Sequence, residues 1–149
     1  MKLRKISAQI FVLLVVSFFA LNSCDKNQQC RRIETGPVDI TIYPNSTEYQ
    51  DLNVVNGWLY LTGRAPSMGI IVFRNSQNSF KAYERTSPVN PNNPDARLVV
   101  DEETGMFAYD SISDTRYLLT DGYPFGGNES CPLTEYYTSY DGFKLRIYY

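Results

Sequence analysis

Short apolar segments separated by turn residues fill this chain from residue 38 to its end, and this spacing limits what it can fold into. Residues 38–42 alternate apolar and polar side chains, as a half-buried strand does. Residues 69–74 form an almost continuous apolar run, typical of a strand buried on both faces. No segment has the apolar spacing of a long amphipathic helix. We therefore expect an all-β fold, a small antiparallel β-sandwich or barrel of about nine strands. The expected strands lie at residues 38–42, 57–62, 69–74, 80–85, 97–100, 106–109, 115–119, 133–140 and 143–148.

Turn residues divide these strands into hairpins and loops. Residues 75–78 and the Asp141-Gly142 pair are expected turns, which predicts hairpins at both places. Residues 87–95 read SPVNPNNPD, and three Pro with three Asn predict a loop. Residues 49–55 fit either an extended segment or one helical turn.

The composition excludes several classes of function. The 149 residues contain no His, so a His general base, an imidazole metal ligand and a Ser-His-Asp triad are all excluded. The only basic residues before Cys24 are Lys2, Arg4 and Lys5. The 126 residues from Cys24 onward therefore carry 11 basic and 16 acidic side chains, a net charge of −5. An acidic chain of this size, with no basic run, predicts one domain and no nucleic-acid partner.

The N-terminus has the pattern of an export signal. Basic residues precede an apolar core at 10–21, which is short for a bilayer span but suits a secretory signal. The tail Leu21-Asn22-Ser23-Cys24 resembles a bacterial lipobox, which implies cleavage before Cys24 and a diacylglyceryl group on its thiol. We expect a lipoprotein signal peptide at 1–23, a polar lipidated tether at 24–36 and a β domain at 37–149. The alternatives are an ordinary signal peptide or an uncleaved anchor helix.

Two further cysteines, Cys30 and Cys131, follow the lipidation site. An exported compartment permits disulfides, and a remaining pair can form only one bond. The sequence leaves open whether they are bonded or remain separate thiols, because their distance in space decides this.

Several segments from residue 69 onward follow one another in an order known from another family. These segments are GIIVF at 69–73, FKAYERT at 80–86, SPV at 87–89, RLVVD at 97–101, DSISDTRY at 110–117 and LLTDG at 118–122. Their order resembles the Rieske iron–sulfur domain, in particular its small lipoprotein branch in Gram-negative bacteria. The resemblance covers about residues 36–149 and implies a Rieske-like β fold.

The resemblance also implies where a cluster would be held. The SPV triplet takes the place of Cys-Pro-His, and DSISDTRY takes the place of Cys-x-x-His-Gly-Ser-x-Phe. A Rieske centre uses two Cys thiolates on one iron and two His imidazoles on the other. The matching positions here are Ser87, Val89, Asp110 and Ser113, so all four ligands are replaced. We therefore expect the scaffold without a cluster, a metal or another cofactor.

These observations predict a cell-envelope protein that is held to a membrane through Cys24 and is not an enzyme. We expect a binding or structural module whose partner is an envelope protein or a glycan. Asp25 leaves the choice between inner and outer membrane open. Three alternatives remain: electron transfer with a cluster on unusual ligands, a carbohydrate-binding module that stacks Tyr rings on sugars, and a fimbrial assembly component that accepts a strand. A hard cation on Asp110, Asp114 and Ser87 is less favoured than ordinary loop hydrogen bonds.

Overall fold

A computed structural model of the chain describes residues 30, 33–62, 67–126 and 130–149. This part of the chain is almost entirely β, which confirms the expected all-β fold. Residues 49–52, for which a helical turn was one option, belong to a short 3₁₀ helix. The elements are β1 (Asp39–Ile42), η1 (Thr47–Leu52), β2 (Trp58–Leu61), β3 (Ile70–Ser76), β4 (Ser79–Glu84), β5 (Val99–Val100), β6 (Phe107–Asp110), β7 (Thr115–Leu118), β8 (Glu135–Tyr140) and β9 (Leu145–Tyr148).

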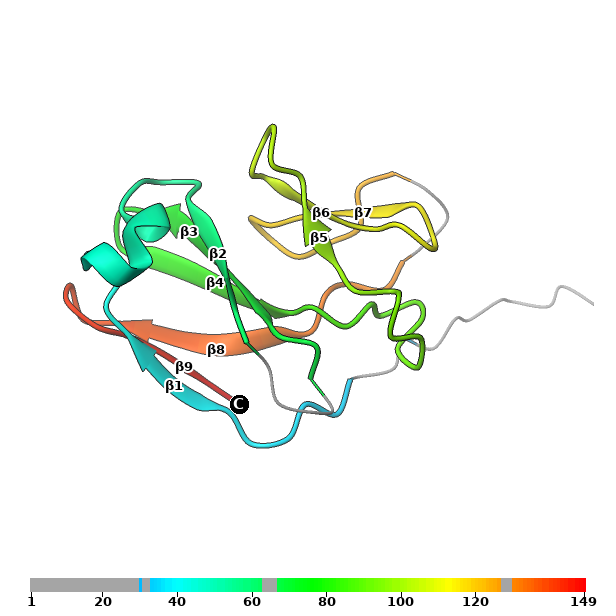
Figure 1. The fold of residues 1–149 in the computed structure, drawn as a ribbon, viewed down its shortest axis with the longest axis horizontal. Coiled ribbons are helices and arrows are strands. Elements are labelled where there is room, and N and C mark those ends of the chain that lie inside the picture. The colour runs from blue at the N-terminus through cyan, green and yellow to red at the C-terminus, as the bar shows by residue number, and fades with distance from the viewer. Residues whose placement is uncertain (1–29, 31–32, 63–66, 127–129) are drawn as a thin grey trace, which may run out of the picture.

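Six strands form the larger sheet, in the order β1-β9-β8-β4-β3-β2. All neighbouring strands are antiparallel, and the two expected hairpins form the pairs β3–β4 and β8–β9. Residues of β1 and residues that follow β2 line one open depression of about 390 Å³. The two edges of the sheet therefore approach each other, and the sheet curls into a half-barrel (Figure 1).

The smaller sheet consists of β5, β6 and β7 and lies over the β3–β4 side of the larger sheet (Figure 1). It contains the two strands expected on either side of the acidic turn at 101–105 and the strand expected at 115–119. The first of its strands is shorter than expected, because only Val99 and Val100 pair with β6, while Arg97 forms an isolated bridge with Thr86. The long loop at 85–98 therefore connects the two sheets.

The core has two parts, one on each face of β3. Ile70 and Val72 pack into a cluster with buried residues of β1, β8 and β9. Ile71 and Phe73 pack into a second cluster with buried residues of the smaller sheet. β3 is thus buried on both faces, which explains the almost continuous apolar run of its sequence.

The segment that leads into the domain is partly packed. Ile33 and Thr35 are buried, so contact with the domain begins within the segment expected as a tether. The expected signal peptide at 1–23 and the expected lipidation site Cys24 lie outside the described residues. In the part of the chain that is described, no helix is both long and apolar enough to cross a bilayer.

Gly122 lies where the chain leaves the smaller sheet and approaches the larger one. Its N–H donates to the Leu118 carbonyl at 2.7 Å, and its carbonyl accepts from the Leu133 N–H at 2.8 Å. Its φ of +76° is in the left-handed region, and an added Cβ would lie 2.7 Å from Cε1 of Tyr83. The Tyr83 ring is buried between the sheets, so it has little room to move aside.

We expect Gly122→Ala to lower the free energy of unfolding by about 2–5 kcal/mol, because left-handed strain adds to overpacking. Gly126→Ala is the matched control: its φ is +75°, but no heavy atom of the described residues lies within 4 Å of the added Cβ. The free energy of unfolding of the control should fall by only about 1–2 kcal/mol, which is the cost of placing Ala in the left-handed conformation. Urea unfolding of both variants measures the difference, and equal losses would show that Tyr83 moves freely.

Candidate functional site

Two loops meet at one end of the smaller sheet. The first runs from Arg85 to Leu98 and joins β4 to β5, and the second, at 111–114, joins β6 to β7. These loops hold the four positions that the Rieske-like resemblance singles out. Ser87 and Val89 lie in the first loop, Asp110 ends β6, and Ser113 lies in the second loop.

A short hydrogen bond joins the first loop to Asp110, the strand end from which the second loop begins. The Ser87 hydroxyl donates to Oδ2 of Asp110 at 2.6 Å, and the Ser113 hydroxyl donates to the same oxygen at 2.9 Å. The other carboxylate oxygen of Asp110 accepts from the Ile112 N–H at 2.8 Å. Ser87 and Asp110 both have 0% exposed surface. The structure therefore brings Ser87, Asp110 and Ser113 together in one polar cluster, in which Ser87 and Asp110 are buried and Ser113 is half-buried.

Val89 takes part in this cluster only through its backbone. Its N–H donates to the Ser87 Oγ at 3.2 Å, and the N–H of Asn90 donates to the same oxygen at 3.2 Å. The Val89 side chain is half-buried and has no donor or acceptor atom. Ser87 is thus an acceptor within its own loop and a donor across to the second loop, which fixes the start of the first loop.

The hydrogen bonds around Asp110 favour its ionised form. Burial by itself would raise the pKa of this carboxyl, but the hydrogen bonds from Ser87, Ile112 and Ser113 outweigh burial and hold the pKa below its usual range. Among the described residues, hydroxyl and backbone donors stabilise this charge.

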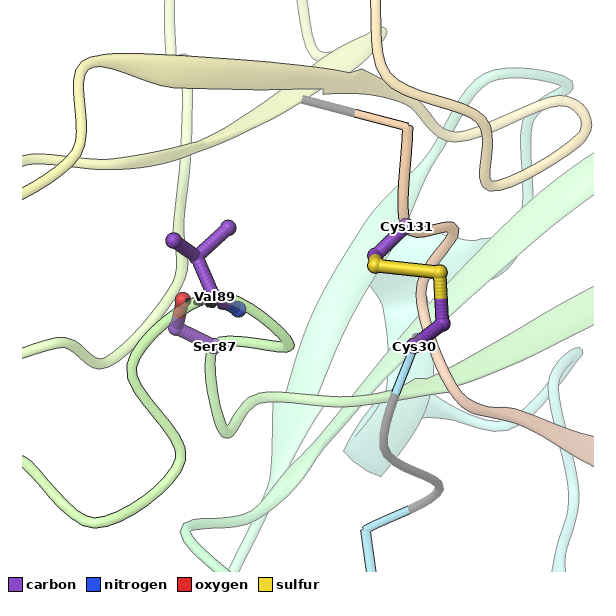
Figure 2. Close-up of a disulfide and its surroundings, with 4 residues drawn as sticks. All are labelled: Cys30, Ser87, Val89 and Cys131. Atoms are coloured by element: carbon purple, nitrogen blue, oxygen red, sulfur yellow. Dashed lines mark hydrogen bonds between the residues drawn. A yellow bond between two sulfur atoms is a disulfide. The ribbon is translucent and has the colours of Figure 1, made fainter. Parts of the chain in front are cut away.

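A disulfide lies beside the first loop. Cys30 and Cys131 are bonded, with their Cα atoms 5.2 Å apart. Figure 2 shows the bond next to the loop that carries Ser87 and Val89. The bond ties Cys30, in the segment that leads into the domain, to the segment before β8, and it spans 101 positions of the sequence.

The donor atoms at the four positions do not suit an iron–sulfur cluster. Such a cluster needs soft thiolates and, in the Rieske type, two imidazoles. Serine hydroxyls and a carboxylate are hard oxygen donors, valine has none, and the chain contains no His. Within the described ranges, no group of three or more His, Cys, Asp or Glu is arranged to hold a metal ion.

The Ser87–Asp110 pair also does not present a nucleophile to a substrate. A serine next to a carboxylate base has the right distance for activation. Both side chains are fully buried, however, and the Ser87 Oγ already accepts two backbone hydrogen bonds. What the arrangement can do is hold two loops in one relative position.

A second buried carboxylate, Glu84, was not predicted as a site residue. Its Oε1 accepts from the N–H groups of Met68 and Thr86 and from the Thr86 hydroxyl, at 3.0, 3.0 and 2.7 Å. Its Oε2 accepts from the hydroxyls of Ser67 and Tyr136, at 2.6 and 2.5 Å. Glu84 therefore joins the end of β4, the approach to β3 and β8 at the base of the first loop.

The sequence did contain a signal for Glu84. Side chains alternate along residues 80–85. Glu84 is two positions from Ala82 and four from Phe80, so its side chain lies on the same buried face of β4 as theirs. A charged residue on an apolar face is unusual and needs several donors. The alternation predicts the strand, and the acid on its buried face indicates a cluster of hydrogen-bond donors.

Arg85 reinforces the base of the first loop. Its guanidinium lies 3.5 Å from the centroid of the Tyr60 ring, and its Nε donates to the Leu98 carbonyl at 3.1 Å. The Tyr60 hydroxyl in turn accepts from the Val100 N–H at 2.8 Å. Burial and the nearby Arg97 lower the pKa of Arg85. The cation–π contact joins the start of the first loop to β2, and the hydrogen bond from Val100 links β2 of the larger sheet to β5 of the smaller one.

Comparison with known proteins returned no relative: no family model, no curated protein and no solved structure matches the chain. The Rieske-like interpretation therefore depends on the order of the sequence segments and on the geometry of the two loops.

We expect Asp110→Asn to lower the free energy of unfolding at pH 7 by about 1–3 kcal/mol, because a buried hydrogen-bonded charge is lost. The folded pKa of Asp110 lies below the unfolded one, so the carboxylate stabilises the fold above about pH 4 and stops doing so as the pH falls through the folded pKa. The difference in free energy of unfolding between the variant and the wild type should therefore become smaller in acid. Asp95→Asn, at an exposed carboxyl of the first loop, is the control, and a pH-independent gap for Asp110→Asn would contradict the assignment.

Removal of the disulfide by Cys30→Ser together with Cys131→Ser should lower the free energy of unfolding by about 2–5 kcal/mol, because the bond closes a long loop in the unfolded chain. The denaturant midpoint measures this loss. Reductant should shift the midpoint of the wild type toward that of the double variant and leave the double variant unchanged. A wild-type midpoint that is insensitive to full reduction would show that the bond contributes no stability.

Proposed function

We propose that this protein is a lipid-anchored envelope protein whose β domain is Rieske-like but carries no iron–sulfur cluster. In this role it is a non-enzymatic binding or structural module held at a membrane surface through Cys24. The lipobox-like tail before Cys24 and the acidic, single-domain mature chain support the anchor and the exported location.

The observation that carries the proposal is the hydrogen bond between Ser87 and Asp110. These are the two positions that match the two thiolate ligands of a Rieske centre, and both thiolates of such a centre bind the same iron. Residues at these positions must therefore lie close together if the match is correct. Their side chains are 2.6 Å apart although 23 positions separate them in the sequence.

The same contact supports the loss of the cluster. In a cluster-bearing domain, metal–ligand bonds hold the two loops together. Here a hydroxyl, a carboxylate and backbone N–H groups hold them together without any soft ligand. The full burial of Ser87 and Asp110 supports a structural rather than a catalytic role for this pair.

Chemical analysis of natively produced protein tests the loss of the cluster. We expect a colourless protein with no visible-range absorbance, no stoichiometric iron or acid-labile sulfide, and no paramagnetic signal after reduction. Stoichiometric iron and sulfide would overturn the proposal and favour the electron-transfer alternative.

Restoring the ligands tests the Rieske-like match. The variant with Ser87→Cys, Val89→His, Asp110→Cys and Ser113→His should acquire a 2Fe–2S cluster on reconstitution, because all four ligands then return to converging loops. A control carries Ile112→His instead of Ser113→His and should acquire none. A folded four-fold variant that stays colourless under the same conditions would contradict the match.

A further inference from the structure

The smaller sheet has one buried and one exposed face. Side chains alternate along β6 and β7, so Ala108 and Tyr117 are buried against the larger sheet while their neighbours face outward. The outward residues are unusually apolar for an exposed sheet face. We call this surface the aromatic face, and it consists of Val99, Phe107, Tyr109, Leu118, Tyr123 and Phe125.

The segment at 123–125 extends this face beyond β7. The Leu118 N–H donates to the Tyr123 carbonyl at 3.0 Å, and the Phe125 N–H donates to the Arg116 carbonyl at 2.7 Å. Pro124 is bridged to Tyr117, whose side chain is buried, so Tyr123 and Phe125 lie on the opposite, outward side. Their side chains are 60% and 62% exposed, and the Phe125 ring lies 5.3 Å from that of Phe107.

The disulfide holds the aromatic face near the expected lipid anchor. Six positions separate Cys24 from Cys30, a reach of at most about 20 Å. Cys30 is bonded to Cys131, and two residues later the Leu133 N–H donates to the Gly122 carbonyl, next to Tyr123. Tyr123 therefore lies within roughly 15 Å of Cys131. A lipid on Cys24 would keep this end of the domain close to the bilayer surface.

We propose that the aromatic face rests on the lipid bilayer that holds the acyl chains of Cys24. This inference rests on the lipid anchor of the proposed function. The short tether makes the bilayer the one apolar surface that is always within reach, so even a weak contact is well populated. Tyr and Phe rings suit the boundary between headgroups and acyl chains, where one edge is wet and the other apolar.

The charges near this face do not favour anionic lipids. Arg116 is exposed between the aromatic side chains and can pair with a lipid phosphate. Glu102 and Glu103 are exposed at the nearby turn, and the mature chain carries a net charge of −5. Attraction to anionic lipids therefore cannot drive the contact. The contact depends on ring insertion and should persist on zwitterionic membranes and at high salt.

Depth-dependent quenching on the full-length lipidated protein tests this contact. Phe125→Trp places a reporter on the aromatic face, and Tyr137→Trp places one on β8 of the larger sheet, where the native side chain is 63% exposed. Trp58 is the only native tryptophan and contributes equally to both variants. Each variant is reconstituted in phosphatidylcholine vesicles with and without brominated acyl chains.

We expect the bromines to quench Phe125→Trp emission and the membrane to shift that emission to the blue. The emission of Tyr137→Trp should change no more than that of the wild type. Adding Phe125→Asp to a Tyr123→Trp reporter should remove most of the quenching of that reporter, because a carboxylate resists entry into the bilayer.

The possible negative results distinguish failure of the lipid anchor from failure of the docking. If mass spectrometry finds no lipid on Cys24, the proposed anchor and this inference both fail. If the protein is lipidated and bound to vesicles but both reporters are quenched equally or not at all, only the docking is overturned. A Phe125→Trp change that depends on protein density rather than on bromine would assign the face to a second copy of the chain and also overturn bilayer docking.

Discussion

The relative position of the two sheets at the loop end depends on the contact between Ser87 and Asp110. The smaller sheet has three short strands, one of which pairs through only Val99 and Val100, and such a sheet has little stability of its own. Its buried face packs against Ile71 and Phe73, and the Ser87–Asp110 hydrogen bond then fixes the loop end against β4. Because this bond is charge-assisted and shielded from water, it resists competition from solvent.

Buried carboxylates organise both strand ends from which the loops begin. Glu84 closes β4 and Asp110 closes β6, and hydroxyl and backbone donors satisfy each of them. Apolar packing alone cannot hold a loop in one conformation, because its backbone groups need directional partners. The two carboxylates supply those partners. In the proposed function, this polar network replaces the metal–ligand bonds that hold the two loops together in a cluster-bearing domain. The loops then keep their positions without a metal.

The disulfide and the aromatic face lie at the same end of the domain. Cys30–Cys131 fixes where the chain enters the domain, and Tyr123 and Phe125 are exposed at the same end. A flexible entry would let a tethered domain tumble freely above a surface. In the proposed membrane-anchored role, a cross-linked entry with large exposed rings beside it would favour one orientation and turn the opposite side of the domain toward solvent.

Local patterns in the sequence determined most of the strands, the two hairpins and a loop at 87–95, because alternation and turn chemistry act over a few residues. They did not determine that β5 would pair through two residues only, or that Glu84 would gather five donors, because those outcomes depend on segments that are distant along the chain. Family resemblance singled out Ser87 and Asp110, but only the tertiary structure placed their side chains in contact. The same holds for Cys30 and Cys131: their number allowed a bond, and the fold decided that they meet, since proximity across 101 positions is a property of packing and not of sequence.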